Sequence, residues 1–254
     1  MTKFSANLGF LWSDLPLPDA IRSAKQAGFD AVECHFPYDT PAEHVRAALA
    51  ETGLPMLGLN TRRGNEAAGD NGLAALPDRV EEARAAIDEA LAYAADIDAA
   101  NIHVMAGIAS GDAAHTTMVD NLRHACSVAE AQGQTILIEP LNSYDVPGYF
   151  LSTTSQAKAI IQEVGAANLK LMFDCYHVQL MEGDLSNKLR ELQPIIGHIQ
   201  FASVPDRGRP DRGEVDYRHI FNHLGDLGYD APLGAEYRPD GETEASLGWM
   251  KSLV

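Results

Sequence analysis

The sequence predicts a single-domain α/β protein, a (β/α)8 TIM barrel spanning residues 1–254, and three observations support this prediction. The chain has 254 residues, the usual size of such a barrel. Eight short, apolar, β-favouring segments recur along the chain, and segments with helical periodicity lie between them. No linker or break in composition divides the chain. A doubly wound sheet is the alternative, but no glycine-rich phosphate-binding turn follows the first segment.

The predicted strands are bounded by Gly, Pro, Asn or Asp and are apolar along most of their length, as strands buried on both faces are. In chain order they cover residues 4–10, 31–36, 56–60, 101–106, 135–139, 169–174, 197–201 and 232–237. The longest irregular stretches, residues 61–76 and 204–215, each follow a strand directly. In a barrel, such loops lie at the end that carries the active site.

The segments between the strands carry helix signals. Thr40 is expected to cap the helix after the second strand, with Pro41 at its first position. Thr153 is expected to cap a later helix that ends at Gly165. Between the third and fourth strands, apolar residues three or four positions apart form one stripe: Val80, Ala83, Ile87, Leu91 and Ala94.

Composition narrows the classes of function. Asp and Glu number 36 against 19 Lys and Arg, and the formal net charge of −17 disfavours binding to nucleic acid or to anionic membranes. The three cysteines form no C-x-x-C pair, so neither a disulfide framework nor a thiolate zinc site is expected. No apolar run reaches the ~18 residues of a membrane span, and no signal peptide is recognised. We therefore expect a cytoplasmic protein.

Several common chemistries lack their motifs. The sequence contains no G-x-S-x-G, no P-loop, no G-x-G-x-x-G and no H-E-x-x-H. Its lysines lie at strand beginnings or on predicted helices, whereas a Schiff-base lysine would lie at the carboxyl end of a barrel strand. Covalent imine chemistry is therefore disfavoured.

Polar side chains stand near the carboxyl ends of the last four predicted strands. These residues are Glu139, Asp174, Gln200 and Glu236, spaced about one strand–helix unit apart. In a closed barrel each would direct one oxygen atom to a common point, and oxygen-rich sets favour Mg²⁺ or Mn²⁺ over Zn²⁺. The alternative is that each acid is solvated or salt-bridged, but burying unpaired carboxylates costs several kcal/mol. We therefore expect a metal site.

Histidines and arginines accompany this set. His177, three residues after Asp174, would bind a substrate oxygen, orient a metal ligand or lie at the polar rim. His198 is either a partner of Gln200 or a core residue, and His35 and His103 are expected to be structural. Six of the 13 arginines follow the third, seventh and eighth strands, where they suit a small anionic substrate or pair with surface acids: 62, 63, 207, 209, 212 and 238.

In their order along the chain, several strings resemble the hydroxypyruvate isomerase family of xylose-isomerase-like TIM barrels. They include IEPLN at 138–142, FDCYH at 173–177, HIQFA at 198–202 and GAEY at 234–237. The resemblance implies that Glu139, Asp174, Gln200 and Glu236 bind a divalent metal. It also implies that Glu139 and Glu236 are the proton donor and acceptor, in an order left open.

The resemblance also selects an arginine. Arg207 matches the arginine that follows Val-Pro in the family, so we expect it to bind the substrate carboxylate, with Arg209 as the second choice. The family usually continues with His and Glu, whereas Gly208 and Arg209 stand here. This departure points to a substrate that differs within the family.

The expected function is a metal-dependent isomerase that interconverts hydroxypyruvate and tartronate semialdehyde, or a closely related small oxo-acid, through an enediolate. The alternatives on the same metal site are a ketose 3-epimerase and a 2-oxo-tetronate isomerase. A sugar-acid-binding barrel without catalysis is a third alternative. A DNA-repair endonuclease would need a histidine-rich multi-zinc site and a basic face, which the net charge of −17 opposes. The expected partner is a small acid, and a homo-oligomer is left open.

Overall fold

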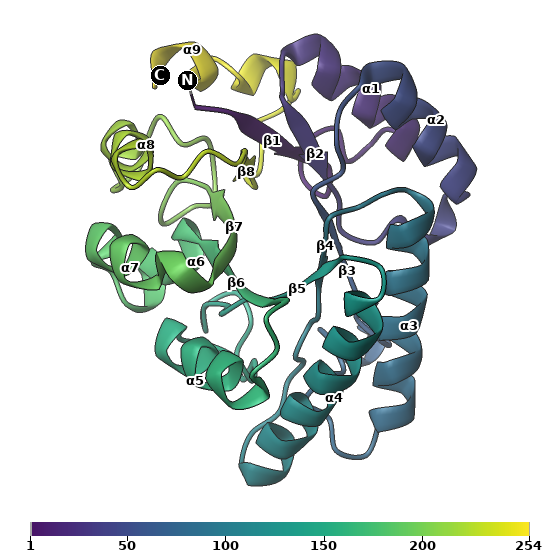
Figure 1. Cartoon of the computed structure of the whole chain (residues 1–254). Coiled ribbons are helices and arrows are strands. Elements are labelled where there is room, and N and C mark those ends of the chain that lie inside the picture. Colours follow the sequence, from purple (N-terminus) through teal and green to yellow (C-terminus); the bar gives the residue numbers. More distant parts are fainter. Residues whose placement is uncertain (1, 254) are drawn as a thin grey trace.

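In the computed structural model, which describes residues 2–253, eight parallel strands form a nearly closed barrel with helices outside it (Figure 1). The hydrogen-bonded strand order is β2-β1-β8-β7-β6-β5-β4-β3. A parallel bridge between Val32 and Met56 joins the two ends of this order. The strands are β1 (Phe4–Asn7), β2 (Ala31–Glu33), β3 (Gly58–Asn60), β4 (Asn101–His103), β5 (Thr135–Ile138), β6 (Leu169–Asp174), β7 (Ile196–Phe201) and β8 (Leu233–Ala235). The predicted (β/α)8 barrel is confirmed.

Several observed strands are shorter than predicted, because the chain turns soon after the barrel rim. In β1 the Asn7 carbonyl accepts the backbone N–H of Leu11 at 2.9 Å, and the Asn7 side chain accepts that of Gly9 at 3.0 Å. These bonds end the strand three residues before Phe10, the predicted limit. The strands nevertheless occur in the predicted order and number.

The outer layer consists of helices, and none within residues 2–253 is long and apolar enough to cross a membrane. The helices are α1 (Leu17–Ala27), α2 (Ala42–Thr52), α3 (Val80–Asp96), α4 (Asp112–Glu130), α5 (Thr154–Val164), α6 (Cys175–Met181), α7 (Leu185–Leu192), α8 (Tyr217–Asp226) and α9 (Trp249–Ser252). Two helices, α6 and α7, follow β6 where one was expected.

Of the two predicted helix caps, one is confirmed and the other is wrong. Thr153 caps α5 as predicted, because its side chain accepts the N–H of Gln156 at 3.2 Å, and Gly165 ends that helix with φ 71°. The capping prediction for Thr40 was wrong: Pro41 is the N-cap of α2, and no side chain caps that end. The backbone N–H of Thr40 instead donates to the Pro37 carbonyl, in a turn that precedes α2.

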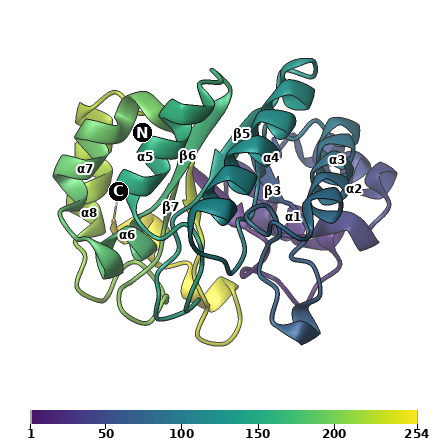
Figure 2. The same ribbon diagram turned by 90° about the horizontal axis from the view of Figure 1, so that it is seen from below.

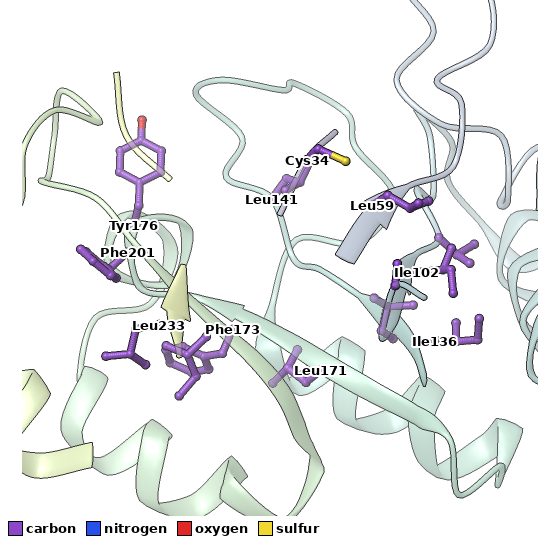
Figure 3. Close-up of a cluster of buried hydrophobic side chains, with 14 of the residues drawn as sticks. Cys34, Leu59, Ile102, Ile136, Leu141, Leu171, Phe173, Tyr176, Phe201 and Leu233 are labelled. Atoms are coloured by element: carbon purple, nitrogen blue, oxygen red, sulfur yellow. The ribbon is translucent and has the colours of Figure 1, made fainter. Parts of the chain in front are cut away.

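The core lies between the strands and the helices. Ile102, Ile136 and Leu171 come from neighbouring strands and are fully buried, and Figure 3 shows them within this apolar cluster. Four of the five residues of the predicted stripe on α3 are buried. Ile87, Leu91 and Ala94 belong to this cluster, whereas Ala83 packs with Leu73 and Ala86 in a smaller one. Burial of this apolar surface is the main force that holds the barrel together.

The loops that follow the strands meet at one end of the barrel. Seen from the side in Figure 2, the blue turn η2 (Glu66–Ala68), which follows β3, and the yellow segment after β8 reach the same lower edge. Every strand is parallel, so all carboxyl ends point to this end. Polar residues at those ends are therefore brought together.

Candidate active site

The four predicted ligand residues lie at this end of the barrel and are all buried. Glu139 directly follows β5, Asp174 is the last residue of β6, and Glu236 directly follows β8. Gln200 lies in β7, where it is the register partner of Asp174. The exposed fractions of the four residues are between 1% and 6%. Such burial of three carboxyl groups is costly unless each has a partner.

Glu236 lies among cationic and polar side chains. Arg207 Nη2 donates to its Oε2 at 2.7 Å, and Asn7 Nδ2 donates to its Oε1 at 3.2 Å. His35 Nε2 is 2.9 Å from the same Oε1. Burial alone would raise the pKa of Glu236, but Arg207 and His35 outweigh it and lower that pKa. Glu236 is therefore favoured as a carboxylate.

Glu139 has the opposite surroundings. Its Oε1 is buried without a hydrogen-bond partner, and its Oε2 lies 3.6 Å from His103 Nδ1. Burial, followed by the nearby Glu236 and Asp174 carboxylates, raises the pKa of Glu139 well above its usual value. Glu139 and Glu236 therefore have opposite electrostatic surroundings within one buried site, and a pair of titratable groups held in this way suits acid–base catalysis.

His177 lies between the acids but is not suited to bind a metal. Its Nε2 lies 3.6 Å from Asp174 Oδ2 and 3.9 Å from Glu139 Oε1, and the three residues form a geometrically plausible ligand group. However, His177 Nδ1 accepts the backbone N–H of Asn142 at 3.0 Å. Burial also lowers the His177 pKa to about 3, so the ring is neutral and its proton must be on Nε2. His177 therefore directs a donor, and not a lone pair, into the site.

Two oxygen atoms of the predicted set fit a divalent cation. Glu139 Oε1 and Gln200 Oε1 are both buried without a hydrogen-bond partner, which is unfavourable unless a cation or another donor contacts them. With the carboxylates of Asp174 and Glu236 the set offers only oxygen, the donor that Mg²⁺ and Mn²⁺ prefer. Among the described residues, the candidate ligand atoms that lie within 4.8 Å of one another belong to Glu139, Asp174 and His177, whereas Glu236 binds Arg207.

Arg207 lies directly against this set. Its Nη2 is 3.5 Å from Asp174 Oδ2 as well as 2.7 Å from Glu236 Oε2. Its guanidinium is held between two rings, with the Phe10 and Tyr176 centroids at 4.9 and 5.0 Å. Arg207 also adopts φ 53°, a left-handed conformation that is uncommon for a residue with a side chain and is often found at functional sites.

A cavity of about 800 Å³ opens above Arg207 at the barrel end. Of the six arginines that follow strands, Arg63, Arg207 and Arg238 line it, together with the apolar Phe36 and Ile108. Arg209 does not line it, because its Nε lies 3.5 Å from the Asp211 carboxylate instead. The structure therefore places Arg207 at the site and Arg209 outside the cavity.

Four further polar residues lie at the site. His35 and His103, expected to be structural, contact Glu236 and Glu139, and two others received no assignment from the sequence: Asn7 and Glu33. Asn7, Glu33 and His103 are the last residues of β1, β2 and β4. Each lies three positions before the predicted end of its strand, at residues 10, 36 and 106, so the criterion of a polar residue ending an apolar strand missed all three because those strands were predicted too long.

His198 is a partner of the site, one of its two predicted roles. Its Nε2 lies 2.6 Å from Glu33 Oε2, and Glu33 Oε1 accepts from Gln200 Nε2 at 2.8 Å. Burial lowers the pKa of His198, but the Glu33 carboxylate outweighs it and raises that pKa. The two residues therefore form a buried ion pair beneath Gln200.

Known proteins share this architecture over nearly the whole chain. The 2-oxo-tetronate isomerase of Cupriavidus necator is 47% identical to this chain, covering 100% of it and 99% of that protein. The hydroxypyruvate isomerase of Escherichia coli is 38% identical, with 98% of each protein covered. The crystal structure of AP endonuclease, family 2, from Brucella melitensis superposes with a TM-score of 0.95 at 38% identity, covering 99% of both chains.

The family model described as xylose isomerase-like TIM barrel matches residues 21–253. The resemblance seen in the sequence motifs is thereby confirmed. The chain belongs to the xylose isomerase-like TIM barrel family.

Proposed function

We propose that the protein is an isomerase of small 2-oxo-acids that carry a hydroxyl group on C3, with hydroxypyruvate and tartronate semialdehyde as the expected pair. The observation that carries this proposal is the contrast between Glu139 and Glu236. The two glutamates lie in one buried site, and their surroundings shift their pKa values in opposite directions. Relatives named hydroxypyruvate isomerase and 2-oxo-tetronate isomerase support the same reaction type.

The reaction moves one proton between neighbouring carbons. One glutamate removes a proton from C3 of hydroxypyruvate to form the enediolate. The proton of the C3 hydroxyl then passes to the C2 oxygen, and return of a proton to C2 by the opposite acid leaves the C3 oxygen as the aldehyde of tartronate semialdehyde. His177 Nε2–H is placed to donate to a substrate oxygen. The guanidinium of Arg207 can take both oxygens of the substrate carboxylate.

Glu139, Asp174, Gln200 and Glu236 would hold Mg²⁺ or Mn²⁺. When bound, such an ion polarises a carbonyl and stabilises negative charge on oxygen. The support for it is the oxygen-only donor set and the two buried oxygen atoms without partners.

A second substrate, 2-oxo-tetronate, has a specific observation in its favour: the relative at 47% identity bears the name 2-oxo-tetronate isomerase. This acid has the same oxo and hydroxyl groups on C2 and C3 and one further carbon. The cavity of about 800 Å³ has room for that carbon.

We also propose that the protein works in the cytoplasm. Cys34, Cys126 and Cys175 are all free and buried, which suits a reducing compartment.

The test is turnover of a panel of three- to six-carbon hydroxy-oxo compounds with Mg²⁺ or Mn²⁺ in D₂O. We expect hydroxypyruvate or 2-oxo-tetronate to be preferred, and deuterium to enter the product at the carbon that receives the proton. E139Q and E236Q serve as inactive controls. Preference for an uncharged ketohexose would instead support a ketose 3-epimerase. Binding of the acids without any turnover would support a sugar-acid-binding barrel.

A further inference from the structure

Gln200 is the one neutral residue of the proposed ligand set, and only one end of its amide can bind a cation. Its oxygen can coordinate a metal, whereas its NH₂ group would repel one. The two ends have nearly the same shape, so the surroundings must decide which end faces the site. This question does not arise for the three carboxylates of the set.

Glu33 decides the orientation through its hydrogen bonds. Its Oε1 lies 2.8 Å from Gln200 Nε2, and an ionised carboxylate can only accept a hydrogen bond. Gln200 must therefore turn its NH₂ group toward Glu33. The other end, Gln200 Oε1, is buried without any partner and faces away from Glu33.

Glu33 is itself fixed on every side. Asn7 Nδ2 donates to its Oε1 at 2.9 Å, and His198 Nε2 lies 2.6 Å from its Oε2. Asn7 cannot turn its own amide, because its Oδ1 accepts the backbone N–H of Gly9 at 3.0 Å. A backbone N–H can only donate a hydrogen bond. The Gly9 N–H therefore fixes the orientation of the Asn7 amide, and the hydrogen bonds from Asn7 and Gln200 to Glu33 are consistent with only one orientation of the Gln200 amide.

The eighth strand leaves space for this pair. Gly234 is the register partner of Gln200, and a Cβ atom there would lie 2.7 Å from Glu33 Oε1 and 2.8 Å from Gln200 Cγ. Glycine is therefore needed at this position for the two side chains to meet.

We propose that Glu33 is a positioning residue that fixes the Gln200 amide with its oxygen toward the metal site. The inference rests on the proposed function for the metal itself. The proposal adds Glu33, from β2, to the predicted ligand residues, which lie on or directly after the last four strands. Partners of this kind, which orient a ligand without touching the metal, commonly change metal affinity about 10- to 100-fold when they are replaced.

The test is Mn²⁺ affinity, measured by isothermal titration calorimetry on the full chain, so the readout does not depend on turnover. E33M keeps the length of the side chain but offers no hydrogen-bond acceptor, so the Gln200 NH₂ group loses its partner and the amide is free to turn. We expect E33M to bind Mn²⁺ about 10- to 100-fold more weakly than the wild type.

Two further variants separate positioning from a general structural role. E182Q is the control: it neutralises another partly buried carboxylate, at the end of α6, that binds Thr154 and Lys188, so its Mn²⁺ affinity should stay close to that of the wild type. The double variant E33M/Q200E should regain the affinity lost in E33M, because a carboxylate presents an oxygen whichever way it turns. It also keeps one acid in the pair, so it can decide the question if E33M fails to fold.

Three results would overturn the proposal: a folded E33M that binds Mn²⁺ like the wild type, an equal loss of affinity in E182Q, or a folded E33M/Q200E that does not recover. Circular dichroism establishes folding in each case. A wild-type protein that binds neither Mn²⁺ nor Mg²⁺ gives a different result, because it would overturn the metal site of the proposed function as well.

Discussion

The space beside Gly234 gives a prediction that depends only on packing. In G234A the new Cβ would lie 2.7 and 2.9 Å from the two Glu33 oxygens and 2.8 Å from Gln200 Cγ. Ordinary contact between carbon atoms begins at about 3.5 Å, so Gln200 or β8 must move by about 0.7 Å. Neither neighbour can move freely, because Glu33 and Gln200 are buried and hydrogen-bonded to each other at 2.8 Å.

The magnitude follows from two contributions. Overpacking a well-packed interior costs about 1–3 kcal/mol. Stretching the Gln200–Glu33 bond beyond hydrogen-bond distance costs about 1.5 kcal/mol more, since the acceptor is charged. We therefore expect G234A to be destabilised by about 3 kcal/mol, which lowers the melting temperature of a protein of this size by roughly 6–12 °C.

The assay is thermal unfolding followed by circular dichroism, with G225A as the matched control. Gly225 lies in α8, and a Cβ atom there would have no neighbour within 4 Å. Because alanine favours helix over glycine, G225A should melt at or slightly above the wild-type temperature. A G234A protein that melts as late as G225A would refute the tight packing of Gly234 against Glu33 and Gln200.

Three further predictions concern the proposed chemistry. Activity should disappear with a strong chelator and return with Mg²⁺ or Mn²⁺, and full activity in metal-free protein would contradict the proposed metal dependence. D174N should bind the metal more weakly in calorimetry, because an amide lacks the charge of the acid. E139Q and E236Q should each lower turnover by more than the ~10²–10⁴-fold typical of lost acid–base catalysis, since each also removes a proposed ligand. Their circular dichroism spectra should stay unchanged, and a near-normal kcat in either variant would exclude that residue from acid–base catalysis. R207K should raise KM for hydroxypyruvate about tenfold or more, equivalent to about 1.4 kcal/mol. R209K should leave KM unchanged because Arg209 lies outside the cavity, and the reverse result would make Arg209 the carboxylate-binding residue.

Much of the fold, and the meeting of the four predicted ligand residues at one end of the barrel, could be predicted because each signal is local. Glu139 and Asp174 stand at the ends of apolar runs, and a parallel barrel brings all strand ends to one side, so their proximity follows from the topology. The limits of the strands were less predictable. The end of β1 depends on how the Asn7 side chain binds the next turn, which apolar composition does not report.

The rest of the site depends on contacts between residues far apart in the chain. Glu33 and Gln200 are separated by 167 positions, and nothing in the sequence around either residue names the other. The two arginines give another example. Arg207 and Arg209 are equivalent by composition, and only the backbone between them, with Arg207 in the left-handed region, sends one into the site and the other toward Asp211.

The strands of the barrel differ in length, and the long strands and the loops contribute different parts of the site. β6 and β7, which carry Asp174 and Gln200, have six residues each, whereas β2, β3 and β4 have three. The six-residue strands β6 and β7 hold Asp174 and Gln200 in register with each other, and the long loop after β3 supplies Arg63 to the cavity. Loops tolerate sequence change far better than paired strands do. Evolution, or a protein engineer, can therefore change the loop at residues 61–76, and with it the lining of the cavity, while the strand ends that carry Asp174 and Gln200 stay as they are.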